Sequence, residues 1–347
     1  MDTAVRRLVA QGLIESTLVD VEEVVGRLLA VQAQDGRGAR LAIRPRLGPK
    51  AKEAGASAVD QALNDGSLVI GWLNRGTLHL VRAEDYRWLR DLTAPRQVTS
   101  NQTRLRQEGV SEKQADKGVE SIVDRLADGP ATRSEIRELL EGQGIPVEGQ
   151  ALVHILFFAS LRGLILRGPV KEGEHAFVLV EDWLDPQPEV DPDAALAELA
   201  RRYLAGHGPA TDRDLAKWAG VTLGQARKGL QAITDELTEE ESGSGTLLDL
   251  KGRPEPGGEP APRLLGAFDP ILHGWESREW LIPDEDGRKV VTTNGIFRPT
   301  ILAGGRIVGT WTMPGGKVEL APFDRLDRSL EETLNEEASR VCDYLGV

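Results

Sequence analysis

The order of apolar and polar positions predicts a helical start to the chain, followed by a strand. Apolar residues recur with helical spacing over residues 21–31, and Asp20 before them is a favourable N-cap with Glu23 three positions later. Residues 68–81 alternate between apolar and polar, as a half-buried strand does. Three helices ahead of a small hairpin make a winged-helix module. We therefore predict a first such module over residues 1–110.

A second copy of this order is predicted over residues 111–190. The segment Gly129-Pro130-Ala131-Thr132 has the composition of a turn that ends in a helix N-cap. The elements predicted are helices at 114–127, from 133 onward and at 151–161, then a hairpin of strands 164–167 and 176–180.

The same turn occurs again as Gly208-Pro209-Ala210-Thr211, and this repeat predicts a third module over residues 191–250. An amphipathic helix at 194–204 precedes this turn, and a further helix at 223–233 follows it. Two helices joined by a tight turn and followed by a third form the arrangement that places a recognition helix against DNA. Winged helices also serve as protein-interaction modules, so both interpretations stay open from the pattern alone.

The remaining region, 251–347, is predicted to be rich in β-hairpins. Its start is a loop rich in proline and glycine, Asn294-Gly295 is a turn signal, and strands at 296–302 and 306–312 flank three small residues. A helix at 325–345 closes the chain. The predicted fold class is α+β, with tandem winged-helix modules and a β-rich C-terminal part.

Composition narrows the class of protein. The single cysteine, Cys342, excludes an internal disulfide framework and favours a reducing, cytoplasmic location. No apolar run approaches the ~18 residues of a membrane span, so we expect no membrane partner. The net charge is −13, yet residues 37–52 carry six basic side chains before the first acid. This distribution fits either solvated faces or one basic groove on an acidic body.

Most catalytic motifs are missing from the chain. The five histidines are scattered without zinc-ligand spacing, and no Gly-x-Ser-x-Gly, Gly-x-Gly-x-x-Gly or phosphate loop occurs. We therefore expect no metal and no cofactor. The run Gln32-Ala33-Gln34 stands out, because two residues one position apart point the same way on an extended backbone. Two such amides can hold a water without a fixed charge.

Four segments taken in order resemble one family. They are Gln32-Ala33-Gln34, Arg75-Gly76-Thr77-Leu78-His79-Leu80-Val81, Phe268-Asp269-Pro270-Ile271-Leu272-His273-Gly274, and Asn294-Gly295-Ile296-Phe297-Arg298-Pro299-Thr300 continuing to Gly309-Thr310-Trp311. Together they resemble the winged-helix DNA glycosylases of the AlkZ and YcaQ family, nearly end to end. The resemblance implies a C-shaped arrangement of the modules and excision of alkylated bases, including interstrand crosslinks. Gln-apolar-Gln is the catalytic motif of the AlkZ branch, which implies catalytic roles for Gln32 and Gln34.

The expected reaction suits two neutral amides. A purine alkylated at N7 or N3 is cationic, so it leaves without a general acid, and the enzyme has to place water at C1′ and stabilise an oxocarbenium-like sugar. We expect Gln34 to orient the water and Gln32 to contact the sugar or the adjacent phosphate. Asp35 could add negative charge or cap the following turn. Thr77 and His79 are candidates for support, although His79 could instead bond a backbone carbonyl.

The expected partner is double-stranded DNA with alkylated purines, bound by a monomer. Candidate phosphate contacts are Arg37, Arg40, Arg44, Arg75, Arg298 and Arg306. The tryptophans Trp72, Trp275, Trp280 and Trp311 are expected in the core. A non-enzymatic transcriptional regulator is the alternative, although regulators usually carry a dimer element and none is evident. A protein-interaction scaffold is a third interpretation. The sequence identifies neither the natural lesion nor whether the role is general repair or self-resistance.

Overall fold

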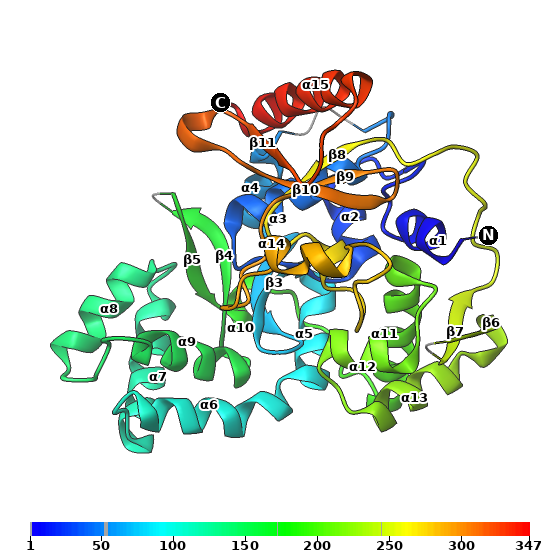
Figure 1. Ribbon diagram of the computed structural model, residues 1–347. Helices are drawn as coiled ribbons and strands as arrows, with labels where there is room; N and C mark the ends of the chain where they lie inside the picture. Colours follow the sequence, from blue (N-terminus) through cyan, green and yellow to red (C-terminus); the bar gives the residue numbers. More distant parts are fainter. Residues whose placement is uncertain (1, 52–54, 172, 244) are drawn as a thin grey trace. The chain divides into compact units, whose positions relative to one another are not determined.

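The computed structural model describes residues 2–51, 55–171, 173–243 and 245–347, which belong to two compact units (Figure 1). The first unit comprises Met1–Val59, Leu196–Trp218 and Thr222–Val347, and the second comprises Asp60–Ala195 and Ala219–Val221. The segment predicted as the first module thus contributes to both units. Helices and antiparallel sheets occur in each, so the predicted α+β class is confirmed.

The second unit contains a sheet and the helices that cover it. Its elements are β2 (Leu68–Leu73), β3 (Thr77–Arg82), α5 (Ala83–Thr93), α6 (Pro95–Gln107), α7 (Glu112–Ala127), α8 (Arg133–Gly142), α9 (Ala151–Leu161), β4 (Ile165–Lys171), β5 (Glu174–Leu179) and α10 (Val180–Trp183). The strands lie in the order β3-β2-β4-β5 with antiparallel neighbours. Three helices, α4 (Ser57–Asn64), α11 (Pro192–His207) and α12 (Asp212–Ala219), cross the boundary of the units.

The segment 68–81 is a hairpin, whereas the alternation predicted one strand. The chain reverses at Asn74, which has a φ of 52°. The two faces of β2 are covered by different helices, because successive side chains point to opposite faces. Gly71 leaves room for the ring of Tyr86 from α5, and Trp72 packs on Phe157 of α9 with ring centroids 5.6 Å apart. Every residue of β2 is buried, because β2 lies between β3 and β4 and helices cover both of its faces.

The first unit has a second sheet. Its elements are α1 (Thr3–Ala10), α2 (Val21–Leu28), β1 (Val31–Gln32), α3 (Gly36–Ile43), α13 (Leu223–Ala232), β6 (Leu237–Ser242), β7 (Gly245–Leu250), β8 (Arg263–Leu265), α14 (Gly287–Val290), β9 (Thr300–Ala303), β10 (Arg306–Thr312), β11 (Glu319–Pro322) and α15 (Arg328–Leu345). The closing helix α15 packs on the sheet β11-β10-β9-β8 (Figure 1). Leu41 of α3 joins the same core with Trp311 and Tyr344, which anchors α3.

The helix predicted at 21–31 ends early. Leu29 has a φ of 63°, which stops α2 at Leu28, and the chain continues as the extended strand β1. Asp20 caps α2 as predicted, since its carboxylate accepts from the Glu23 amide at 2.8 Å.

The predicted repeat of helix, turn, helix, helix and hairpin is present in the second and third modules. In each, the alanine after Gly-Pro makes two backbone hydrogen bonds to the second wing strand. Ala131 pairs with Phe177 of β5, and Ala210 pairs with Leu248 of β7. Phe177 and Leu248 therefore hold equivalent positions, and the strand pairing from Arg167–Phe177 to Ile165–Leu179 corresponds to that from Glu239–Leu248 to Leu237–Leu250. Beyond Arg167 the register of β4 and β5 shifts, so the correspondence ends there.

Candidate active site

The two glutamines lie on the same side of the extended segment, as their spacing predicts. The Gln32 amide nitrogen donates to the Gln34 amide oxygen at 2.8 Å. Gln32 is 7% exposed, whereas Gln34 is exposed. The bond orients the two amides relative to each other. The Gln34 amide nitrogen and the second lone pair of the Gln34 amide oxygen then face a ligand at the surface.

Asp35 begins α3. Its carboxylate accepts from the backbone N–H of Gly38, so it serves as the N-cap of α3. This is the capping role that the sequence left open beside a catalytic one. The cap fixes where the helix starts and so fixes the residue just before it, Gln34.

Two glycines let α3 approach the segment that follows β8. A Cβ at Gly38 would collide with the carbonyl oxygen of Ala267, and a Cβ at Gly266 would lie 2.8 Å from the Leu41 Cβ. Only glycine permits such close backbone packing. The helix that begins directly after the Gln pair is therefore packed closely against this segment, which suits a site that must position water.

The adjoining segment connects two of the remaining motifs. Phe268 lies parallel to the ring of His273 at 6.0 Å and lies 5.7 Å from Phe297, and the centroids of His273 and Phe297 are 4.0 Å apart. Segments about thirty residues apart thus meet in one aromatic cluster of Phe268, His273 and Phe297. The sequence points to both segments but not to this contact, which only their shared aromatic content could have suggested.

A buried ion pair locks the same segment. The Arg46 guanidinium donates to both oxygens of Asp269 at 2.9 and 2.7 Å, and both side chains are 0% exposed. Arg46 also donates to the Gln11 oxygen at 3.0 Å. Because each charge has its partner inside the protein, this arginine is not offered to a ligand, and removing either partner would leave a buried charge unpaired.

His79 and Thr77 belong to β3 of the second unit. The His79 Nδ1 lies 2.8 Å from the Thr77 carbonyl oxygen, which is the backbone partner that the sequence offered as the alternative. Burial lowers the pKa of His79 to about 3, so the imidazole is neutral at physiological pH. A neutral imidazole cannot act as a general acid at this pH. A supporting catalytic role for His79 or Thr77 stays a prediction.

The candidate phosphate contacts divide by exposure. Arg37, Arg298 and Arg306 are exposed, while Arg40 and Arg75 are half-buried. Arg44 differs from the expectation. Its guanidinium bonds the carboxylate of Glu337 from α15, and the two side chains are 11% and 1% exposed. The charge of Arg44 is therefore balanced inside the protein and is not available to a phosphate.

The tryptophans expected in the core are largely there. Trp72, Trp275 and Trp311 are buried, and Trp280 is half-buried. The indole N–H of Trp311 donates to the Leu265 carbonyl at 2.9 Å. Buried indoles with such bonds are structural.

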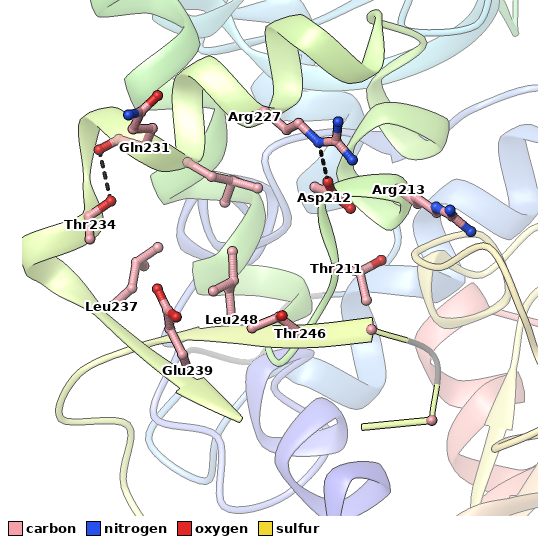
Figure 2. A pocket seen from close by; sticks show the side chains of 13 residues that line it. Thr211, Asp212, Arg213, Arg227, Gln231, Thr234, Leu237, Glu239, Thr246 and Leu248 are labelled. Carbon is pink, nitrogen blue, oxygen red and sulfur yellow. Dashed lines mark hydrogen bonds and ion pairs between the residues drawn. The ribbon is translucent and has the colours of Figure 1, made fainter. Parts of the chain in front are cut away.

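A cavity of about 640 Å³ lies in the third module, away from the glutamines in sequence (Figure 2). Helix α13, the start of α12 and the β6–β7 hairpin line it. Arg227 is paired there with Asp212 at 2.6 Å, and Glu239 adds a carboxylate. Arg213 also lines this cavity (Figure 2), and neither glutamine of the pair does.

Two features are absent from the residues that the structure describes. No cluster of three or more potential metal-ligating side chains was found in that part of the chain. Nor does any of its helices have the length and apolar character needed to cross a membrane.

The repeated module places the chain among the winged-helix proteins. Residues 25–344 match the family model of AlkZ-like DNA glycosylases, so the chain belongs to that family and is a DNA glycosylase. It is 28% identical to an interstrand DNA cross-link repair glycosylase of Streptomyces sahachiroi over 98% of this chain and 95% of that protein. The solved structure of the Streptomyces sahachiroi DNA glycosylase AlkZ superposes with a TM-score of 0.79 and 26% identity, covering 100% of this chain and 98% of that one.

Proposed function

We propose that this enzyme hydrolyses the N-glycosidic bond of N7- or N3-alkylated purines in duplex DNA, using a water held by Gln32 and Gln34. The observation that carries the proposal is the hydrogen bond between the two amides. It lies directly before the N-terminus of α3, a helix in close backbone contact with the segment after β8. A site that selects one water needs fixed donors and acceptors, and this pair supplies both.

The chemistry needs no acid. An alkylated purine carries positive charge, so it departs as a neutral base when the glycosidic bond breaks. Gln34 then orients the attacking water toward C1′, and Gln32 contacts the sugar as its oxocarbenium character develops. The surrounding groups fit these roles of the two glutamines. Asp35 is engaged as a helix cap, and His79 is neutral, so neither is needed as an acid.

Bulky adducts and interstrand crosslinks are included in the proposed substrates. Gln34 is exposed and not enclosed at the bottom of a pocket. A base tethered to the opposite strand cannot be flipped into a closed pocket, so an accessible amide suits such a lesion. The name of the Streptomyces sahachiroi relative supports this extension.

The test is base release from duplex DNA that contains N7-methylguanine, measured under single-turnover conditions. Replacing Gln32 or Gln34 by alanine should slow release at least ~10-fold, about 1.4 kcal/mol of barrier each. Gln231→Ala in the third-module cavity is the matched control and should keep the native rate. Unchanged release in both site variants would remove the glutamines from the mechanism.

A crosslinked duplex then tests the wider substrate range. Unhooking by the native protein, lost in the Gln34→Ala variant, would place monoadducts and crosslinks in one site. Binding of either DNA with no base release would instead favour the role of a DNA-binding regulator.

The pH profile gives a second test of the mechanism. Neutral amides do not titrate, so the single-turnover rate should be flat between pH ~6 and ~9. A unit slope in that range would require a titrating acid or base that the proposal does not contain.

A further inference from the structure

The wings of the second and third modules carry opposite charges at one equivalent position. Arg167 of β4 pairs with Phe177, which is the residue that bridges to Ala131. Glu239 of β6 pairs with Leu248, which makes the same bridge to Ala210. Arg167 and Glu239 are therefore counterparts in the repeat, and the two wings differ at this point in sign of charge.

Arg167 is held by aromatic rings. Its guanidinium carbon lies 5.3 Å from the ring centroid of Trp72 and 5.0 Å from that of Phe177, and these two rings are themselves stacked. Two faces of this kind hold a planar cation in one orientation. The side chain is thus positioned before any ligand arrives.

The charge of Arg167 has no carboxylate partner among the described residues. Its Nε is buried without a hydrogen bond, and no salt bridge joins it to an acid. Burial, together with the nearby Arg133 charge, lowers the pKa of Arg167 to about 10, and Glu174 opposes this shift. The group is still a cation at neutral pH, and among the described residues the two rings, and no carboxylate in contact, offset part of its desolvation.

Other arginines of the same unit differ from Arg167, because acids pair with them. Arg137 of α8 bonds Glu141 and Glu148 at 2.8 and 3.1 Å, and Arg162 bonds Asp116 at 2.5 Å. Those cations are neutralised by acids of the same unit. Arg133 is exposed at the first turn of α8, where the helix N-terminus adds partial positive charge.

We propose that Arg167, together with Arg133, binds a backbone phosphate of the substrate DNA at the wing of the second module. A phosphodiester supplies the anion that the stacked guanidinium lacks, and its two free oxygens match the planar donor edge. The equivalent Glu239 makes the third wing unsuitable for the same contact. This inference rests on the proposed action on DNA and adds the module that grips the backbone.

The experiment uses Arg167→Met in the full chain, because methionine keeps an apolar stem on the two rings. Affinity for a short undamaged duplex is measured by fluorescence anisotropy across a salt series, and Tm is measured alongside. The slope of log K against log salt should fall in magnitude by about 0.9 for the lost phosphate contact, with Kd raised several-fold. The Tm should change little, because the half-buried charge has no ion pair to lose and methionine keeps apolar contact with the rings.

Arg137→Met is the matched control, because it removes the same net charge from the same module while taking away an internally paired arginine. It should leave the salt slope at the native value. An equal loss of slope in both variants, or no loss in Arg167→Met, would overturn the inference. Native base release together with salt-dependent binding that Arg167→Met leaves intact would overturn this contact alone, whereas a native protein that neither binds nor cleaves would overturn the proposed function as well.

Discussion

Arg46 and Asp269 lie 223 residues apart in sequence and make a two-point salt bridge between fully buried side chains. The bridge ties the turn after α3 to the segment that supports it. Asp269 also accepts from the backbone N–H of Ile271 at 3.1 Å, so both of its oxygens are hydrogen-bonded. The position of the Gln pair therefore depends on a contact remote from it in the chain.

Removing one partner of that pair should be costly. Asp269→Ala leaves the Arg46 charge buried and unpaired, which should lower the free energy of unfolding by about 3–5 kcal/mol. Urea denaturation measures the change. Glu319→Ala, an exposed carboxylate on β11, is the control and should shift the midpoint little. A small effect of Asp269→Ala would mean that water reaches Arg46.

Adding one methyl group at Gly38 should disturb the site. Gly38→Ala sets a Cβ against the Ala267 carbonyl, so α3 must move or strain, at about 1–3 kcal/mol. We expect a larger loss of base release than the stability loss alone explains, because the helix that carries Gln34 at its foot is displaced. Gly224→Ala in α13 is the matched control, since its nearest neighbour would be 3.9 Å away, and it should leave the rate unchanged.

Arg44 and Arg37 should separate stability from DNA binding. Arg44→Gln breaks the pair with buried Glu337, so Tm should fall while the salt slope of DNA binding keeps its native value. Arg37→Gln removes an exposed charge beside the Gln pair, so the slope should fall by about 0.9 with Tm unchanged. A reduced slope in Arg44→Gln at native Tm would reverse our assignment of Arg44 to the fold.

Acid should destabilise the protein through buried His207. Its ring stacks on Tyr203 at 4.8 Å, and burial lowers its pKa from 6.5 to about 3. Below pH 6.5 the unfolded chain therefore binds a proton that the folded chain refuses. Stability present above pH 6.5 is lost as pH falls toward 3, with a slope of up to about 1.4 kcal/mol per pH unit.

The measurement is urea unfolding from pH 7.5 down to pH 4.5. His207→Phe keeps an aromatic ring against Tyr203 and should show a shallower loss of stability, with the remaining slope carried in part by His79, whose pKa is also about 3. An identical slope in the variant and the native protein would show that His207 takes up its proton in the folded state.

Local pattern predicted local structure well. Helix α9 has the bounds predicted for it, and the two Gly-Pro-Ala-Thr turns begin equivalent helices. Caps and helix faces rest on contacts within a few residues, so the sequence displays them directly. The shared orientation of Gln32 and Gln34 was predictable for the same reason, because it follows from the two-residue period of an extended chain.

Sequence by itself determined the α+β class, the repeated module and the residues of the Gln pair. Tertiary structure alone decided that 68–81 is a hairpin between two helices, that Arg44 pairs with Glu337, and that Arg167 lies over two rings with no acid paired to it among the residues described. The physical reason is the range of the interactions. A helix cap or a helix face is made by neighbours in the chain. Whether a buried charge is paired depends instead on which distant residue the fold places against it.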